Sequence, residues 1–562
     1  MQYDFNFRSR RSNVISRNGM VASSHPLASV VGLDILKAGG TAADAAVAMA
    51  ATLGVVEPFS SGVGGDCFAL YWEAATHQVH ALNASGPAAR HSSLQELLDA
   101  GYTQYPLWNG QAVSVPGAVA GWHALLKRFG RMNLEDVLKP AIAYADDGYA
   151  ITEYIAHGWS SILAKLLRGD PVAEQAKPLH QRFGGPMQPS GGEFLVDGQA
   201  PKVGEIMRLP SLAATLRGIS ADGQDFIYKG EFSRDLCAHV QRYGGWLQPE
   251  DLSNYQPEWV EPIFADYHGY HLYECPPNGQ GLAAIMAAHI ANGFDLAGMN
   301  VVDRTHTLVE CMRLGFTEAL AWVCDPHFQK IPYEQLFSEA YINSRRCMID
   351  PLHALEHIET DVISTGDDTT YLSVIDGEGN ACSFINSLYF GGGTGLVVPG
   401  TGVLLQNRAA TFSLDPTHPN VLEGGKRPYQ TIIPGMITHQ GELYASLGVM
   451  GGFMQPQGHL QMLVNLVDLG YNPQLALDMP RFCLSVLGGG MGAIDPGGEL
   501  LLEESFAPAD VAALQAQGHQ VTSVSGYDRV RFGGGQIILR DPGSGVLTGG
   551  SEPRKDGCAL GF

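Results

Sequence analysis

The residues Asp368-Thr369-Thr370 could supply a nucleophile if the backbone were cut immediately before Thr369. They stand where a polar stretch, 358–368 (IETDVISTGDD), meets a run of β-branched and aromatic residues. A threonine hydroxyl needs a neighbouring base, and a threonine at a chain terminus carries one in its own α-amine. The unperturbed pKa of that amine, about 7.7 to 8.0, leaves a useful neutral fraction near physiological pH. Cleavage here would create a catalyst for amide hydrolysis or acyl transfer, although a Thr-Thr pair at a strand start by itself indicates only β-propensity.

The elements around this threonine alternate between helices and strands. Residues 19–72 predict a strand, a helix ended by Gly39-Gly40, a second helix, a glycine loop and a strand. Further helices are predicted after Val115-Pro116-Gly117 and from Pro210. Beyond about Asp368 the chain becomes rich in strands, with a hairpin turn at 376–379. This order predicts a layered α/β architecture.

The composition excludes several classes of protein. At 562 residues, with 45% hydrophobic and 16% charged residues, the chain is expected to fold into a compact globular protein with more core than one ordinary domain. The formal net charge of -23 argues against nucleic acid or an anionic membrane surface as a partner. The longest run of small apolar residues, 42–56, is too short to span a bilayer.

The cysteines and the N-terminus indicate a reducing compartment. Nine cysteines are an odd number, and none form a Cys-x-x-Cys pair. The first twenty residues lack the apolar core of a secretory signal. We therefore expect a cytoplasmic protein.

Segments spread along the chain resemble one enzyme family. In the first part they are GMVAS (19–23), VGLDILKAGGTAADAAVA (31–48), SVPGAVAG (114–121), DFIYKG (225–230), LQPEDLSNY (247–255) and CPPNGQG (275–281). In the second part they are TTYLSVIDGEGNACSF (369–384), GTGLVVPGTGVLLQNRAATFS (393–413), GKRPYQTIIP (425–434) and LGVMGG (447–452). Together they resemble the γ-glutamyltransferase family of N-terminal-nucleophile (Ntn) hydrolases, from about Gly19 to the C-terminal SEPRKDGCALGF.

This resemblance implies a proenzyme that cuts itself between Asp368 and Thr369. The products would be a large subunit, 1–368, and a small subunit, 369–562, held together in a four-layer αββα sandwich with extra helices from the large subunit. Thr369 would be the nucleophile, and Ser387 a second hydroxyl that assists processing. Gly451 and Gly452 match the family's oxyanion-hole glycines, whose backbone N–H groups can point at a developing negative charge.

The resemblance fails at the residues that bind a γ-glutamyl group. Family members that act on glutathione hold its carboxylate with an arginine, where this chain has Asn83. They hold its ammonium group with an acid, where this chain has Thr411, with Arg408 three residues earlier. Three further substitutions affect the same region: Gln430 and Thr431 replace a serine pair, and Tyr389 replaces an asparagine.

An arginine in place of an ammonium-binding acid favours a substrate with a carboxylate and no α-amine. Among the family's relatives, one that hydrolyses oxamate to oxalate and ammonia, in scavenging of purine nitrogen, fits this logic. We therefore expect Arg408 to clamp the carboxylate while Thr369 attacks the amide, with Asn83, Thr411, Gln430 and Thr431 as further substrate-binding candidates. A structural salt bridge at Arg408 and activity as a glutathione hydrolase or γ-glutamyltransferase remain alternatives, and Arg90 is a second arginine to consider.

One pattern belongs to a different class of enzyme. His353-Ala354-Leu355-Glu356-His357 matches the H-x-x-E-H motif of zinc hydrolases. It lies close before the expected cleavage point, and the sequence offers no identifiable third ligand, so two surface histidines are the simpler interpretation. The expected partners are thus a small amide substrate and the two subunits of one precursor, with no metal or cofactor. A dimer of processed heterodimers and a processed but inert binding protein are left open.

Overall fold

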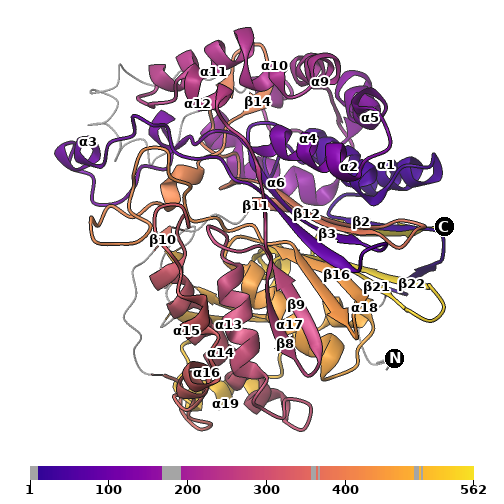
Figure 1. Ribbon diagram of the computed structural model, residues 1–562, viewed down its shortest axis with the longest axis vertical. Coiled ribbons are helices and arrows are strands. Elements are labelled where there is room, and N and C mark those ends of the chain that lie inside the picture. Colours follow the sequence, from indigo (N-terminus) through magenta and orange to yellow (C-terminus); the bar gives the residue numbers. More distant parts are fainter. Residues whose placement is uncertain (1–10, 168–191, 356–362, 365–367, 486–492, 495–497) are drawn as a thin grey trace.

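Two antiparallel sheets stacked face to face form the centre of the computed structural model, which describes residues 11–167, 192–355, 363–364, 368–485, 493–494 and 498–562. Helices cover the outer face of each sheet, as Figure 1 shows. The predicted αββα layering is confirmed.

The first sheet carries Thr369 in its middle. Its strand order is β23-β2-β11-β12-β3-β4-β7. The bounds are β23 (Cys558–Gly561), β2 (Met20–Ser23), β11 (Asp368–Ile375), β12 (Ala381–Tyr389), β3 (Asp66–Glu73), β4 (Gln78–Ala84) and β7 (Glu258–Val260). The predicted turn at 376–379 joins β11 to β12, and Asp376 Oδ1 accepts the backbone N–H groups of Glu378 and Asn380.

The second sheet has the order β1-β22-β21-β16-β15-β9-β8. Its strands are β1 (Val14–Ser16), β22 (Leu547–Ser551), β21 (Gly534–Arg540), β16 (Glu442–Met450), β15 (Gly435–His439), β9 (Tyr270–Glu274) and β8 (Ile263–Tyr267). Apolar side chains of both sheets, such as Phe68 and Tyr371 from the first and Met436 and Ile538 from the second, form the core between them.

A helical layer covers each sheet. The layer on the first sheet contains α1 (Pro26–Lys37), α2 (Ala42–Val56), α4 (Ala118–Phe129), α5 (Leu134–Asp147) and α9 (Pro210–Asp222). The layer on the second contains α13 (Gly281–Ala291), α14 (Val301–Trp322), α17 (Met454–Val467), α18 (Pro473–Asp478) and α19 (Pro508–Ala516). Among the described helices, none combines the length and apolar character needed to cross a bilayer.

Helix α2 illustrates why these segments are helical. Thr41 and Asp44 form a capping box, in which each side chain accepts the other's backbone N–H. All fifteen of its residues are buried, and eleven of them are alanine, valine or glycine, so the helix can lie close to its neighbours. The turn before it uses Gly39 at φ +92°, as predicted from the Gly-Gly pair.

The remaining helices and strands lie outside the two central sheets. They are α3 (Leu94–Asp99), α6 (Glu153–Leu167), α10 (Asp225–Tyr228), α11 (Gly230–Arg242), α12 (Pro249–Ser253), α15 (Tyr333–Leu336), α16 (Glu339–Arg346), the 3-10 helices η1 (Gly110–Ala112), η2 (Gly192–Phe194), η3 (Arg408–Thr411) and η4 (Gly526–Phe532), and the strands β5 (Tyr149–Ala150), β6 (Ile206–Met207), β10 (Ile363–Ser364), β13 (Val397–Val398), β14 (Val403–Leu404), β17 (Phe482–Ser485), β18 (Ala493–Ile494), β19 (Glu499–Glu503) and β20 (Val521–Val524).

The expected subunits 1–368 and 369–562 are not separate domains. Strands from both segments are interleaved within the first sheet, where β2 pairs with β11 and β12 pairs with β3. The second sheet mixes them too, because β9 pairs with β15. Both segments are therefore needed to complete each sheet.

Candidate active site

Thr369 lies at an irregularity near the start of β11. The pairing with β12 shifts between Asp368, opposite Tyr389, and Thr370, opposite Asn386. A bulge of this kind redirects a side chain out of the regular alternation of a strand. Thr369 is buried, and its Oγ1 donates a hydrogen bond of 3.1 Å to Ser387 Oγ.

Ser387, near the end of β12, connects Thr369 to a cation. Its Oγ also accepts from the backbone N–H of Tyr389 at 2.8 Å and from Arg408 Nη2 at 3.2 Å. The loop before β3 approaches Ser387 very closely, since a Cβ on Gly65 would lie 2.4 Å from Ser387 O. Only glycine fits at position 65 without moving the backbone of Ser387.

Arg408 is a fully buried cation beside the two hydroxyls. Its Nη1 donates to Thr431 Oγ1 at 2.7 Å, and its guanidinium carbon lies 4.4 Å from the centre of the Tyr389 ring. The Nε of Arg408 has no hydrogen-bond partner in the described part of the chain. Burial lowers the pKa of Arg408 to about 10, while Asp66 and Tyr389 oppose that shift, so the side chain is charged at neutral pH. A buried N–H group without a partner is costly, which makes this edge of the guanidinium a candidate ligand contact.

Asp66 is a charged site residue that the sequence analysis missed. It begins β3, is fully buried, and accepts hydrogen bonds from Gly86 N, Gly117 N and Gln406 Nε2 on Oδ1, and from Gln430 Nε2 on Oδ2. Burial raises its pKa to about 6, and the charge of Arg408 opposes this shift. An acid directly after Gly64-Gly65 at the start of an apolar strand was the available signal.

Gly451 and Gly452 form the turn between β16 and α17. Their φ angles are +125° and +57°, so both lie where side chains other than glycine are strained. Neither backbone N–H donates to an acceptor in the described residues, whereas the Gly452 carbonyl accepts from Gln280 Nε2 at 2.9 Å. The same Nε2 donates to the carbonyl of Thr431, so Gln280 ties the glycine turn to the partner of Arg408. Gln280 was also missed, because a single buried amide carries no pattern in sequence.

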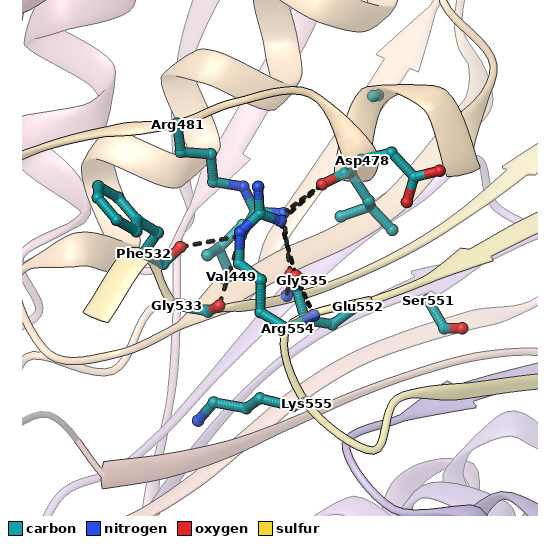
Figure 2. A network of polar contacts seen from close by, with 12 residues as sticks. Val449, Asp478, Arg481, Phe532, Gly533, Gly535, Ser551, Glu552, Arg554 and Lys555 are labelled. Carbon is teal, nitrogen blue, oxygen red and sulfur yellow. Dashed lines mark hydrogen bonds and ion pairs between the residues drawn. The ribbon is translucent and has the colours of Figure 1, made fainter. Parts of the chain in front are cut away.

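A buried ionic cluster of Arg481, Glu552 and Arg554 lies next to this turn. A Cβ on Gly451 would lie 3.1 Å from the Cα of Gly533, which is therefore in close contact with the turn. Figure 2 shows the guanidinium of Arg481 between the backbone of Phe532 and Gly533 and the carboxylate of Glu552. Arg554 binds the other oxygen of Glu552. Although burial opposes ionisation, Arg481 and Arg554 together lower the pKa of Glu552, so the cluster keeps its charges.

The other predicted residues take different places. Thr411 Oγ1 donates to the carbonyls of Arg408 and Tyr429, so its hydroxyl shapes the backbone around Arg408. Asn83 Nδ2 donates to Asn278, which donates to Ser85, and Ser85 in turn accepts from Gln430 beside Asp66. Arg90 is exposed, and its backbone N–H binds Asp251. Of the predicted residues with side-chain polar groups, Thr369, Ser387, Arg408 and Thr431 are joined directly.

The histidines of the zinc alternative do not join this site. His353 is exposed and contacts Asp350, while Glu356 and His357 lie outside the described residues. A different buried group, His306, Glu310 and His519, has ligand atoms within 4.8 Å of one another. Arg313 Nε lies 3.5 Å from Glu310 Oε1, so that carboxylate already has a cation beside it.

Comparisons with known proteins identify the family to which the chain belongs. The model of the family described as gamma-glutamyltranspeptidase matches residues 28–562. The chain is 34% identical to the glutathione hydrolase-like YwrD proenzyme of Bacillus subtilis, over 98% of this chain and 99% of that protein. It is 31% identical to the oxamate amidohydrolase proenzyme of Klebsiella pneumoniae, over 98% of this chain and all of that protein. The chain also resembles the crystal structure of cephalosporin acylase from Bacillus halodurans, with 41% sequence identity and a TM-score of 0.88. The match covers 100% of this chain and 99% of the acylase chain. The chain therefore belongs to the γ-glutamyltranspeptidase family and is an Ntn amidohydrolase.

Proposed function

We propose that the chain cleaves itself between Asp368 and Thr369 and then hydrolyses a small amide that carries a carboxylate next to the scissile carbonyl. Oxamate, which would give oxalate and ammonia, is the leading candidate. The observation that carries this proposal is the pair of hydrogen bonds that joins Thr369 to Ser387 and Ser387 to Arg408, with donor–acceptor distances of 3.1 and 3.2 Å.

The reaction would run through an ester on Thr369. The α-amine takes the proton of Oγ1 as that oxygen attacks the amide carbonyl, and the N–H groups of Gly451 and Gly452 bind the oxyanion. The resulting ammonium group returns the proton to the leaving nitrogen, and the C–N bond breaks. Water, activated by the same amine, then cleaves the ester and restores the hydroxyl. This sequence needs no group beyond the chain and water.

Arg408 would recognise the carboxylate. Only two hydrogen bonds in series separate its guanidinium from the nucleophile, so the substrate's carboxylate must lie near its reacting carbonyl. The unpartnered Nε–H offers a donor in the guanidinium plane, which suits the planar geometry of a carboxylate. The nearby acid, Asp66, is already bound by four N–H donors, so it is poorly placed to hold a substrate ammonium group.

A second candidate is an acylase that removes a larger acyl group from an amine. The 41% identity to a cephalosporin acylase over the whole chain favours it. The family also contains proteins named glutathione hydrolase, so γ-glutamyl amides are a third class to test. The three classes of substrate differ in the distance between the carboxylate and the scissile carbonyl and in the presence of an α-amine.

Self-cleavage can be tested by intact mass on the purified protein. We expect two fragments that begin at residues 1 and 369 and together account for the precursor. Thr369→Ala should remain uncut. Thr370→Ala is the matched control, because Thr370 is the next residue and its hydroxyl, within the described part of the chain, donates only to the carbonyl of Asn386 at 3.4 Å. An active preparation that consists of one uncut chain would contradict the mechanism.

The substrate class can be tested with a panel on the processed protein. Oxamate, its uncharged counterpart oxamide, a γ-glutamyl amide and an acylated cephalosporin would be compared by kcat/KM. The proposal predicts the highest value for oxamate and at least about tenfold less for oxamide, since a lost charge-assisted contact costs ~1.5 to 3 kcal/mol. Preference for the cephalosporin amide would establish the acylase instead.

A further inference from the structure

We propose that Tyr389 determines which substrates the site accepts, by covering one face of Arg408 so that only a planar anion in the guanidinium plane can bind. This inference deepens the proposed function and rests on it. It makes Tyr389 a positioning residue, which acts on the substrate through Arg408.

The backbone of Tyr389 is unusual. Its φ is +82°, a left-handed conformation that is a genuine outlier for a bulky residue. Such conformations persist only where the surroundings maintain them, and they cluster at ligand sites. At Tyr389 the left-handed backbone coincides with the irregular pairing opposite Thr369 and directs the residue's N–H to Ser387 Oγ.

The ring of Tyr389 covers the guanidinium of Arg408. The guanidinium carbon lies 4.4 Å from the ring centre, and both residues are buried. A cation over an aromatic face in a desolvated site is stabilised by the ring's negative face. The ring itself is packed edge to face against Phe390, which packs in the same way against Trp108. It is therefore held in place and cannot easily move aside for a ligand.

The covered face leaves Arg408 few directions in which to bind. Nη1 already bonds Thr431, Nη2 bonds Ser387, and Nε has no partner in the described residues. With one face closed by Tyr389 and both amino groups bonded, the edge that carries Nε is the contact that we assign to the substrate. A carboxylate that is coplanar with the guanidinium fits this edge, whereas a bulky tetrahedral group beside the carboxylate, such as an α-amino carbon, would meet the ring.

The test compares substitutions that keep or remove the aromatic face. Tyr389→Phe keeps the ring, and Tyr389→Leu keeps apolar bulk without a π face. The readout is the ratio of kcat/KM for oxamate to that for oxamide, or for the carboxylate-bearing amide that the wild type cleaves fastest and its carboxamide. This ratio does not depend on how much of the protein is folded. We expect it to change less than about threefold in Tyr389→Phe and to fall about tenfold in Tyr389→Leu, mainly through KM for the anionic substrate.

Tyr105→Leu is the matched control. Tyr105 is a buried tyrosine of the same apolar cluster, and its hydroxyl binds the carbonyl of Gln111. Its loss should affect stability without changing the ratio. Should Tyr389→Leu fail to mature, Tyr389→Asn replaces it, because asparagine tolerates positive φ. An unchanged ratio in a processed Leu or Asn variant overturns the role of Tyr389 and leaves the proposed function intact. A wild type that cleaves no carboxylate-bearing amide overturns both.

Discussion

At the scale of single residues, Arg408 combines a charge with a fixed geometry. Its two amino groups bind two different hydroxyls, Thr431 and Ser387, and Ser387 is the hydroxyl that contacts Thr369, the proposed nucleophile. A guanidinium can make these contacts and still present a third N–H in the same plane, whereas an ammonium group cannot. The site therefore depends on the shape of this cation as well as its charge.

Arg408→Lys should consequently raise KM for a carboxylate-bearing amide by at least about tenfold, with a smaller effect on kcat, because the planar contact is lost while positive charge remains. Initial rates over a range of substrate concentrations would measure the two constants. Arg427→Lys is the control, because Arg427 is a mostly buried arginine that binds Glu258 and the Ser85 carbonyl. Equal effects of the two substitutions would refute the assigned role of Arg408.

Because of Asp66, the free energy of unfolding should decrease as the pH rises from about 4 to about 6. Its pKa in the folded protein is about 6, above the ordinary value of 3.8, because burial disfavours its charge. A raised pKa in an acid means that the stabilising contribution is present below pH 3.8 and is lost as pH rises through about 6. The loss amounts to roughly 3 kcal/mol at 1.36 kcal/mol for each pH unit.

Asp66→Asn should remove this dependence. The side-chain carbonyl of asparagine can still accept from Gly86 and Gly117, and Gln430 can turn its unpartnered Oε1 toward the new amide. Urea unfolding at pH 4.5 and pH 7.5 would show the wild type losing more stability than the variant over this interval. Parallel changes in both proteins would mean that Asp66 does not titrate there.

At the scale of elements, the sequence predicted those parts whose boundaries are encoded locally. Gly39-Gly40 ends α1, Gly117 precedes α4 and Pro210 begins α9, because glycine and proline restrict the backbone wherever they occur. The hairpin between β11 and β12 was predicted for the same reason. Thr369 and Ser387 needed the resemblance to a family, since a threonine at a strand start is otherwise ordinary.

The residues that sequence reasoning missed act through long-range contacts. Asp66 faces Gln406 and Gln430, which are more than 300 positions away, and Gln280 reaches Thr431 and Gly452. Nothing within a short window of sequence distinguishes such side chains from other buried polar residues. Their role becomes visible only when the sheets bring the segments together.

Gln280 gives a prediction at this scale. It precedes α13, and its Nε2 donates to the carbonyls of Thr431, the partner of Arg408, and of Gly452. Gln280→Glu replaces this donor with an acceptor and should push both carbonyls away, which would displace the Gly452 N–H. Loss of one oxyanion donor costs about 10²- to 10³-fold in kcat, and we expect a decrease approaching that size.

The matched control is Gln461→Glu, which alters another buried glutamine that binds two backbone carbonyls, those of Gln457 and Phe482. Thermal unfolding would show whether the two variants lose similar stability. A similar loss of kcat per processed molecule in both would mean that Gln280 acts only on stability.

At the scale of the whole molecule, the two segments expected from cleavage are interleaved rather than adjacent. β11 has β2 on one side and β12 on the other, and β12 in turn pairs with β3. The C-terminal β23 also pairs with β2, near the N-terminus. The described cysteines form no disulfide, so only noncovalent contacts would join the fragments after cleavage.

We therefore expect the processed fragments to remain together without a covalent link. Separation would expose the backbone groups of several central strands and divide the core between the sheets, and both changes are strongly unfavourable. Size-exclusion chromatography of the processed protein should give one species that contains both fragments, and urea should dissociate and unfold them in one transition. Uncut Thr369→Ala provides the reference for a covalently joined chain. Because the intact chain unfolds as one molecule while the processed pair separates into two, the midpoint of the processed protein should rise with protein concentration, whereas that of Thr369→Ala should not. A midpoint that does not respond to concentration in either protein would mean that the fragments stay associated after unfolding.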